Sequence, residues 1–351
     1  MQFGARTNRS LRWATGGAAI VVGLAACGGG SGEEDASGGS AAEGGGFYQD
    51  ETIDLVVPYD PGGGYDVYAR AIAPYLGDCL GADIVVRNEP GAGGLLATSA
   101  TAVAEPDDNR LQLMNTVGFA AAQIADAEGV RFDLAEMSWL GRVADATPAL
   151  TVGADSEISG FADIIDASEP VRFVATGPGG DDYIVPTVLS AAYGFPLQVI
   201  TGFPGSGEAR NALVAGDADA QALSLTSQVP SVQSGEVRAV LVVDDESNEL
   251  LPDTPPISEF SPADEEAQGL VDSLVTLGAS GRAIAGPPGL PEERLAELRE
   301  GLDCALGSEA LLQDLGPERP INPMGGDEYA DEVEALLDAS PEFEAAIKAS
   351  F

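Results

Sequence analysis

The sequence predicts an α/β fold with two lobes and a ligand cleft between them. Two observations support this prediction. Apolar strand patterns alternate with helical patterns along most of the chain, and the alternation runs in two series. Glycine-rich loops connect strands to helices in both series. Because ligands in open α/β sheets lie beyond the carboxyl ends of the strands, the loops of the two lobes would face a common cleft.

The first series begins after a stretch rich in Gly, Ser and Glu. Its elements are, in chain order, a strand over 53–58, a helix over 66–76, a strand over 82–87, a helix over 94–104 and a strand over 111–115. A less regular stretch over 132–150 follows, and it leads into a candidate crossing strand at 149–152. This order of elements predicts a parallel sheet with helices on its faces.

The second series repeats the same order of strand, glycine turn and helix. Its elements are a strand over 171–175, a helix over 184–193, a strand over 197–200, a helix over 209–215, strands over 218–225 and 237–243, and a return strand over 274–285. Terminal helices follow over 291–306, 309–315 and 327–337. Pro291 is well placed to start the first of these, because proline suits the beginning of a helix.

The two series of elements predict which residues form each lobe. We predict that residues 48–148 and 275–351 together form lobe 1, and that residues 149–274 form lobe 2. Trp139 and Phe173 are expected in the hydrophobic core rather than as ligand contacts. The acidic run Asp264-Glu265-Glu266 is expected to be a solvated loop.

Two glycine loops of the first series are the clearest candidates for a binding site. The loops at 61–66 and 88–94 each follow an apolar strand and lead into a helix. Glycine has no Cβ, so backbone N–H groups can approach a ligand closely. The first N–H groups of the following helix are unpaired and carry a partial positive charge. The sequence therefore predicts an anion cradle built from backbone, without buried basic side chains.

The chain is strongly acidic. Its 351 residues include 16 basic and 57 acidic side chains, which gives a formal net charge of −41. Such a surface repels nucleic acid and anionic membranes, so we expect no nucleic-acid partner. Two interpretations of the charge stay open. It is either an ordinary solvated acidic face or an adaptation to high external salt, where ions screen the repulsion.

The N-terminal segment has the pattern of a lipoprotein signal peptide over residues 1–26. Arg6, Arg9 and Arg12 precede an apolar stretch that is too short to cross a membrane. Leu24-Ala25-Ala26-Cys27 resembles a bacterial lipobox, which predicts lipidation of Cys27. Residues 27–47 would then form the lipidated end and a flexible tether. We expect an exported protein that is anchored to the outer face of the cell membrane.

The cysteine and histidine content limits the kinds of catalytic and metal site that the chain can form. The chain contains no His, which removes His-based nucleophilic triads and His-ligated zinc. We therefore expect no enzyme, no metal and no cofactor. Apart from Cys27, the sequence has Cys79 and Cys304. In an exported protein such a pair favours a disulfide, which would pin the helix near 291–306 to lobe 1; two buried thiols are the alternative.

Several motifs in this order resemble the substrate-binding proteins of tripartite tricarboxylate transporters, the TctC or Bug family. The resemblance runs from about Thr52 to about Leu337. Its motifs are Val56-Val57-Pro58 with Gly62-Gly63-Gly64, Asn88-Glu89-Pro90-Gly91-Ala92-Gly93-Gly94, Phe203-Pro204-Gly205-Ser206 with 212–219, and Ser234-Gly235-Glu236-Val237-Arg238-Ala239 with 251–256. One glycine loop would be weak evidence, whereas four motifs in the expected order are specific.

The resemblance implies a periplasmic-binding-protein fold of the type II kind that closes on a small organic carboxylate. The protein would be a monomer that delivers its ligand to a two-component membrane permease. The lobe 1 contacts that it implies are Tyr59, Gly63, Gly64, Tyr65, Asp66, Gly91, Ala92, Gly93 and Gly94. Those from lobe 2 are Gly179, Gly180, Asp181, Asp182, Phe203, Ser206, Thr226 and Ser227.

This chain departs from the family pattern at the expected site. Tyr65 stands where the family commonly has Thr or Ser, and Asp181 and Asp182 stand where it commonly has small hydroxyl residues. Glu89 replaces the usual Arg. A carboxylate in the site makes anion binding more costly unless a proton, water or cation lies between the charges. Tricarboxylate is therefore the ligand class that we least expect.

Several alternatives remain at this stage. The ligand could be an amino acid whose ammonium pairs with Asp181 or Asp182, or an aromatic acid that stacks on Tyr65 or Phe203. Alternatively, the two carboxylates face solvent and cap the helix that begins near Ile184. A partner of a sensor kinase would use the same cleft, so the sequence does not separate it from a transport protein. An enzyme with paired carboxylates is disfavoured, because adjacent side chains seldom point to one spot.

Overall fold

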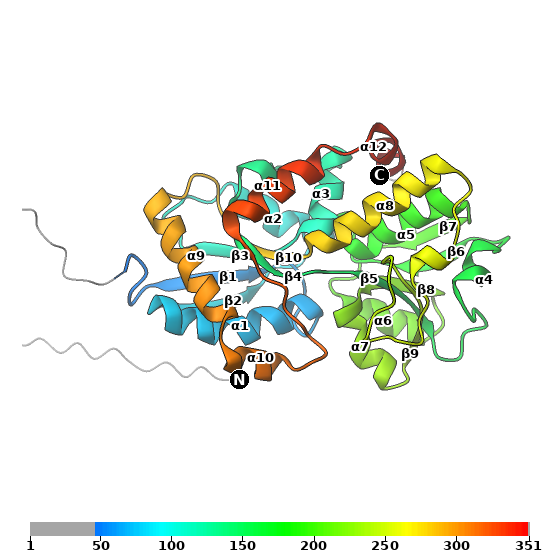
Figure 1. Ribbon diagram of the computed structural model, residues 1–351, viewed down its shortest axis with the longest axis horizontal. Helices are drawn as coiled ribbons and strands as arrows, with labels where there is room; N and C mark the ends of the chain where they lie inside the picture. Colours follow the sequence, from blue (N-terminus) through cyan, green and yellow to red (C-terminus); the bar gives the residue numbers. More distant parts are fainter. Residues whose placement is uncertain (1–45, 350–351) are drawn as a thin grey trace, which may run out of the picture. The chain divides into compact units, whose positions relative to one another are not determined.

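The computed structural model describes residues 46–349. The predicted signal peptide, the lipidation of Cys27 and most of the tether lie outside the described residues. Within the described part, the strands form two sheets (Figure 1). Sheet A has the strand order β11-β4-β10-β3-β1-β2, and sheet B has the order β7-β6-β8-β5-β9. The predicted two-lobed α/β class is confirmed.

Sheet A combines the first strands of the chain with late ones. Its strands are β1 (Thr52–Val57), β2 (Asp83–Asn88), β3 (Arg110–Asn115), β4 (Ser138–Ala144), β10 (Arg282–Gly286) and β11 (Met324–Gly325). β1 pairs in parallel with β2 and β3, whereas β10 lies antiparallel between β3 and β4. The helices that belong to this part are α1 (Gly64–Leu80), α2 (Leu95–Ala102), α3 (Thr116–Ile124), α9 (Glu292–Leu306), α10 (Glu309–Leu315) and α11 (Gly326–Leu337).

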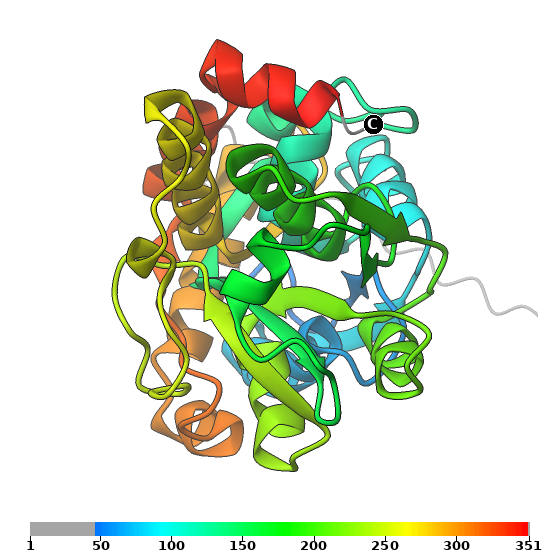
Figure 2. The ribbon, with the colours of Figure 1, turned by 90° about the vertical axis from the view of Figure 1, so that its right-hand side faces the viewer.

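Sheet B is built from the middle of the chain. Its strands are β5 (Pro148–Gly153), β6 (Val171–Val174), β7 (Leu197–Ile200), β8 (Ala220–Ser224) and β9 (Val237–Val242). The helices around it are α4 (Phe161–Ile165), α5 (Asp181–Tyr193), α6 (Ser206–Val214), α7 (Leu225–Gln233) and α8 (Glu265–Ser280). The last helix, α12 (Pro341–Lys348), contacts α3, α5 and α8, and it lies at the top of Figure 2.

The chain passes between the sheets at two places, from β4 to β5 and from α8 to β10. These crossings lie together, because the backbone N–H of Ala146 donates to the carbonyl of Gly278 over 2.9 Å. Trp139 and Phe173 are buried in one apolar cluster with residues of both sheets, which confirms them as core residues. Both crossings therefore run beside a continuous hydrophobic core.

Two predictions at the second crossing are wrong. The expected return strand over 274–285 is split, because α8 continues to Ser280 and the strand β10 occupies only Arg282–Gly286. The positive φ of Gly281 (68°) separates the two elements. The acidic run at 264–266 is not a loop either. Asp264 caps α8 by accepting from the backbone N–H of Ala267 (2.9 Å), and the other two residues form its first turn.

The pattern also misses some elements and shortens others. β4 lies inside the stretch described above as irregular, and all seven of its residues are buried. α3, α7 and α12 were not predicted. α1 extends over 64–80 rather than 66–76, and α5 begins at Asp181 rather than at Ile184. The glycine-rich loop before α5 is therefore about three residues shorter than predicted.

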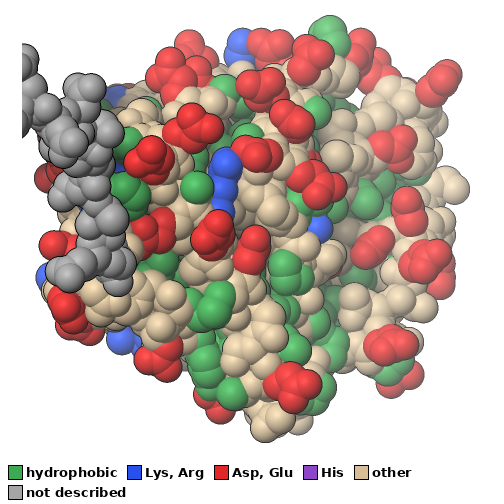
Figure 3. Space-filling model, turned by 60° about the vertical axis from the view of Figure 1, so that its left-hand side comes forward, with side chains coloured by type: hydrophobic (Ala, Val, Ile, Leu, Met, Phe, Trp, Pro, Cys, Tyr) green, Lys and Arg blue, Asp and Glu red, His purple; other side chains and the backbone are tan. Residues whose placement is uncertain are grey.

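The acidic excess is spread over the surface. Figure 3 shows Asp and Glu side chains across the face in view and few Lys or Arg side chains among them. None of the described helices is both long and apolar enough to span a bilayer.

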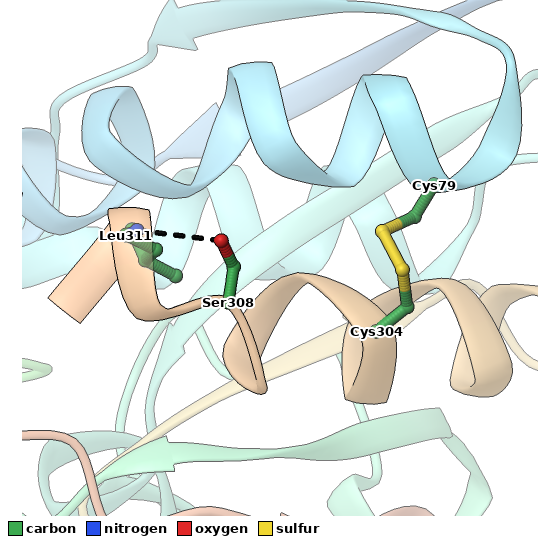
Figure 4. The surroundings of a disulfide bond; sticks show 4 residues. All are labelled: Cys79, Cys304, Ser308 and Leu311. Atoms are coloured by element: carbon green, nitrogen blue, oxygen red, sulfur yellow. Dashed lines mark hydrogen bonds between the residues drawn. A yellow bond between two sulfur atoms is a disulfide. The ribbon is translucent and has the colours of Figure 1, made fainter.

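A disulfide joins Cys79 near the end of α1 to Cys304 in α9 (Figure 4). The two Cα atoms are 6.2 Å apart, and the two residues are separated by 225 positions in the sequence. α1 and α9 pack along each other, and Leu80, Leu298 and Leu302 belong to the same apolar cluster. The bridge therefore ties the C-terminal part of the chain to the first helix of sheet A.

Candidate functional site

The starts of several helices surround one small cavity. Its lining residues come from loops after strands of both sheets and are Tyr59, Gly63, Gly64, Tyr65, Thr176, Asp181, Asp182, Ser206 and Leu223. The cavity measures about 20 Å³, which is room for about one water molecule. The structure thus brings predicted site residues of both lobes to one place, at the carboxyl ends of strands β1, β6, β7 and β8.

Four of the described helices begin here without a side-chain cap. The N-cap residues are Gly63 for α1, Gly180 for α5, Gly205 for α6 and Ser224 for α7, and within residues 46–349 none of them gives its helix a side-chain cap hydrogen bond. The first-turn N–H groups of a helix have no intrahelical acceptor, and the helix dipole adds a partial positive charge. Their convergence makes the site suited to an anionic group.

The two halves of the site meet backbone against backbone. A Cβ at Gly93 would stand 2.6 Å from the carbonyl oxygen of Gly177 and 2.6 Å from the backbone nitrogen of Gly180, and Gly93 has a φ of +65°. Gly179 lies in the same contact, because its backbone nitrogen faces Gly93 and its carbonyl oxygen faces Gly118. A side chain at Gly93 would therefore push the loop over 92–94 away from the loop over 177–180.

Tyr59 and Tyr65 form an aromatic wall of the cavity, with ring centroids 5.1 Å apart. The Tyr59 hydroxyl donates to the carbonyl of Gly93 (3.2 Å) and accepts from Asn115 Nδ2 (2.6 Å). The Tyr65 hydroxyl is buried and has no hydrogen-bond partner among residues 46–349. Burial raises the pKa of both hydroxyls well above the usual value, so both stay protonated and can donate.

Asp181 and Asp182 are both buried, with 3% and 1% of their surface exposed, so the expectation that they face solvent is wrong. Asp182 accepts from the backbone N–H (2.8 Å) and the hydroxyl (3.0 Å) of Thr176, which holds the loop before α5 in place. Asp181 Oδ1 accepts from the backbone N–H of Asp182 (3.1 Å), while Asp181 Oδ2 has no partner within the described residues. The two neighbours thus have different surroundings.

Their titration differs for the same reason. Burial raises the pKa of Asp181, and the charge of Arg282 opposes that rise. Burial raises the pKa of Asp182 well above its usual value, and the charge of Asp181 raises it further. Both carboxyls are therefore harder to ionise than an exposed Asp, and the charge of Arg282 favours the ionised form of Asp181.

Arg282 is a site residue that the sequence reasoning missed, and it corrects the expectation of a cradle without buried basic side chains. It is fully buried, and its guanidinium carbon lies 4.8 Å from the ring centroid of Tyr65 and 4.9 Å from that of Tyr68. It donates to the hydroxyls of Thr226 (3.3 Å) and Ser227 (3.2 Å). An available signal was one Arg at the start of an otherwise apolar strand.

The other hydrogen bonds that Arg282 donates also have neutral acceptors. The guanidinium donates to the hydroxyl of Ser224 and to the carbonyl of Asp145, the latter over 3.3 Å. Its Nε has no acceptor, and no carboxylate forms an ion pair with it, within residues 46–349. Thr226 and Ser227, which were predicted as ligand contacts, thus serve as acceptors for this buried cation.

Other predicted residues organise the loops rather than line the cavity. Asp66 accepts from the backbone N–H of Gly62 (2.9 Å), from Asn88 Nδ2 (2.9 Å) and from Arg70. Burial alone would raise the pKa of Asp66, but these hydrogen bonds and the Arg70 charge lower it below the usual value. Glu89, which replaces the family's usual Arg, is paired with Arg110 through two hydrogen bonds (3.0 and 2.6 Å).

The outer members of the predicted set lie further from the cavity. A Cβ at Gly91 would meet the side chain of Leu96, and a Cβ at Gly94 would stand 2.8 Å from the ring of Phe119. Ala92 is exposed. Phe203 is half-buried against the apolar cluster around α6 and does not line the cavity. Thr176 and Leu223 do line it, although neither was singled out as a contact.

Comparison with known proteins identifies the fold and the family of this chain. The UPF0065 protein in the tcbD-tcbE intergenic region of Pseudomonas sp. (strain P51) is 28% identical over 279 residues, which is 76% of this chain and 78% of that protein. The structure of the periplasmic binding protein BugD matches with a TM-score of 0.73 and 21% identity, and the match covers 86% of this chain and 98% of that one. MatC from Rhodopseudomonas palustris with bound malate matches with a TM-score of 0.70 and 23% identity, over 85% of this chain and 99% of that one.

The two solved structures support the fold of two lobes. The model of the family named TctC, described as "Tripartite tricarboxylate transporter family receptor", matches residues 68–301. That range includes most of α1, both crossings between the sheets, and all of sheet B. Because it spans more than half of the 351 residues, this chain belongs to the TctC family of tripartite tricarboxylate transporter receptors.

Proposed function

We propose that this protein is an extracytoplasmic solute-binding lipoprotein that captures a small organic acid between its two lobes. The observation that carries the proposal is the convergence of four helix N-termini, from both halves of the fold, on one cavity. A carboxylate there would accept hydrogen bonds from backbone N–H groups of both halves at once. The malate named for the solved MatC structure is a ligand of this class.

Capture works through closure of the lobes. Lobe 1 consists of residues 48–148 and 275–351, and it contributes Tyr59, Gly63, Gly64 and Tyr65 to the cavity. Lobe 2 consists of residues 149–274, and it contributes Thr176, Asp181, Asp182 and Ser206. A ligand that contacts both lobes only when they are closed shifts the population toward that form. The two crossings between the sheets are the hinge.

Delivery follows from the family and from the N-terminal segment. The receptor hands its ligand to a two-component membrane permease, which recognises the closed surface. Residues 1–26 direct export, lipidated Cys27 anchors the protein to the outer face of the membrane, and the tether lets a monomer reach the permease. The family description as a transporter receptor supports this role over one in sensing.

A thermal-shift screen tests capture. The mature chain without residues 1–26 is heated with small mono-, di- and tricarboxylates and with amino acids, at low and at high salt. A ligand at a hundredfold its Kd adds about 2.7 kcal/mol to the free energy of unfolding, which raises the Tm by a few degrees. A panel that leaves the Tm unchanged, with the protein folded by circular dichroism, would contradict the proposal.

A separate measurement tests delivery. Uptake of the labelled ligand is followed in cells that carry the permease with the wild-type receptor, and in cells whose receptor has Cys27→Ser. We expect uptake to depend on the receptor and to fall when the anchor is removed. Uptake that is equal with and without the receptor would remove the transport role and leave ligand capture intact.

A further inference from the structure

Two unpartnered polar atoms belong to side chains that line the cavity. Tyr65 is 6% exposed and Asp181 is 3% exposed, and among residues 46–349 neither the Tyr65 hydroxyl nor Asp181 Oδ2 has a hydrogen-bond partner. A buried polar atom without a partner costs free energy, and a charged one costs more. Both atoms belong to the site, so a ligand that supplies their partners recovers that cost on binding.

The two atoms require different partners. Asp181 Oδ2 is a carboxylate oxygen and requires a donor, ideally one with a positive charge. The Tyr65 hydroxyl is held protonated and can donate to an acceptor. A ligand that is only an anion would satisfy the hydroxyl but would bring a second carboxylate to Asp181, and like charges at short range repel. A ligand with both an ammonium and a carboxylate satisfies both atoms.

The carboxylate of such a ligand has a place away from Asp181. The N-terminus of α1 lies against those of α6 and α7, because a Cβ at Gly63 would stand 3.2 Å from Ser206 Oγ and a Cβ at Gly64 would meet Ser227 Oγ. The first turn of α7 contains no acidic residue, and Asp66 in the first turn of α1 is paired with Arg70. The first turn of α6 contains Glu208, and that of α5 contains both Asp181 and Asp182. The positive ends of α1 and α7 are therefore the ones best suited to a carboxylate.

Buried charge supports the same arrangement. Arg282 has no carboxylate partner among the described residues, and it lies behind Tyr65 and next to Ser227, on the side of α1 and α7. Asp181, at the start of α5, is the carboxyl on which the charge of Arg282 acts, in favour of its ionised form. A zwitterion adds no net charge to a buried site that holds these two groups.

We propose that the site selects amino acids, with the ligand ammonium on Asp181 Oδ2 and the ligand carboxylate on the Tyr65 hydroxyl and the N-termini of α1 and α7. This inference rests on the proposed solute-binding function and narrows its ligand class. Asp181 and Tyr65 are then the residues that determine specificity, and Asp182 is the neighbour that holds their loop through Thr176.

Matched ligand pairs test this inference by isothermal titration calorimetry. Each pair differs only in the α-amino group: alanine and propionate, aspartate and succinate, glutamate and glutarate, and phenylalanine and phenylpropionate. For the mature wild-type chain we expect at least one amino acid to bind at least about tenfold more tightly than its partner, since a charge-assisted hydrogen bond typically contributes that much or more.

Two variants assign the preference to its residues. Asp181→Asn should weaken binding of the amino acid by about tenfold or more and leave or improve binding of the partner without the amino group. Tyr65→Phe should weaken both members of the pair and leave the unfolding midpoint unchanged or higher, because it removes a buried hydroxyl without a partner. Asp253→Asn is the matched control, because this exposed residue of the same sheet B half makes the same change in charge.

The outcomes separate this inference from the function on which it rests. Equal or tighter binding of the partners without an amino group would overturn the amino-acid inference and leave capture of organic acids standing. A preference for the amino acid that persists in Asp181→Asn would overturn the assignment to Asp181. Failure of every compound to bind a folded wild-type chain would overturn both the inference and the proposed function.

Discussion

Arg282 combines full burial with the absence of an ion pair within the described residues. A buried charge is costly unless its donors are satisfied. Here hydroxyls at the start of α7 accept most of the donors, and the faces of two tyrosine rings contribute cation–π attraction. Because Arg282 lies in β10 and its hydroxyl acceptors lie at the end of β8 and the start of α7, this side chain also ties sheet A to sheet B.

Replacing this side chain by a neutral one of similar length tests both roles. In Arg282→Met the hydroxyls of Ser224, Thr226 and Ser227 lose their donor. We expect the free energy of unfolding to fall by about 1–3 kcal/mol and the affinity for a carboxylate ligand to fall by about tenfold or more. Urea denaturation measures the first quantity and calorimetric titration the second.

The control is Arg87→Met. Arg87 forms an ion pair with Asp54 (2.5 Å) in which its own side chain is about half exposed, and such pairs contribute about 0–1 kcal/mol. Its loss should change stability little and ligand affinity not at all. If both methionine variants unfold and bind alike, Arg282 has no special role.

Site residues were predictable where a local requirement reveals them. Gly93 is such a residue, because its φ of +65° and the backbone of the facing loop leave no room for a side chain. Arg282 was not predictable, because its hydroxyl acceptors lie 55 to 58 positions away in the chain. The difference between Asp181 and Asp182 is also tertiary, since both line the cavity but only Asp182 accepts hydrogen bonds from Thr176.

At the scale of elements, the boundary between α8 and β10 shows why a pattern can mislead. Leu270, Leu274 and Leu277 are buried with helical spacing, but apolar residues resume in β10 after only Ser280-Gly281-Arg282. A short apolar run fits a buried strand as well as a buried helix. α3 was missed for a related reason: seven of its nine residues are buried, so it has no polar face to reveal a helical period.

The pairing of α1 with α9 depends on the disulfide as well as on apolar packing. The bridge between Cys79 and Cys304 closes a loop across 225 positions of the chain. In the chain-entropy model a loop this long stabilises the folded state by roughly 4 kcal/mol or more, by restricting the unfolded chain. We expect a reducing agent to lower the Tm of the mature wild-type chain clearly in a calorimetric scan.

The double variant Cys79→Ser with Cys304→Ser provides the comparison. It should melt at a lower temperature than the oxidised wild type, and the reducing agent should leave its Tm unchanged. Ligand affinity should stay the same, because neither cysteine lines the cavity. A Tm of the wild type that does not respond to reduction would show that the bridge contributes no stability.

At the scale of the whole molecule, the order of elements was predictable and their exact contacts were not. The repeat of strand, glycine turn and helix predicts two α/β sheets, and the last part of the predicted return strand corresponds to β10 in sheet A. Long-range packing determines the strand register and places β10 antiparallel between β3 and β4. It also brings the two crossings together. The cavity lies where those long-range contacts converge.

The net charge acts on the molecule as a whole. With 57 acidic and 16 basic residues, most carboxylates have no cation available, and the view in Figure 3 has acidic side chains across its face. The basic side chains that do form ion pairs are largely surface ones, for which each pair contributes about 0–1 kcal/mol. Repulsion among the remaining carboxylates therefore destabilises the compact fold at low ionic strength.

Salt should relieve this repulsion and raise stability. The Debye length falls from about 10 Å at 0.1 M to about 3 Å at 1 M salt, so neighbouring surface carboxylates become screened from each other. We expect the Tm to rise steeply between about 0.1 and 1 M KCl, where ions of this size act mainly by screening. A variant with Glu249→Gln, Asp253→Asn and Glu300→Gln, all exposed, should start from a higher Tm at low salt and gain less from KCl. If the wild type and this variant respond to KCl in parallel, the acidic face is an ordinary solvated surface and the interpretation as adaptation to high salt is wrong.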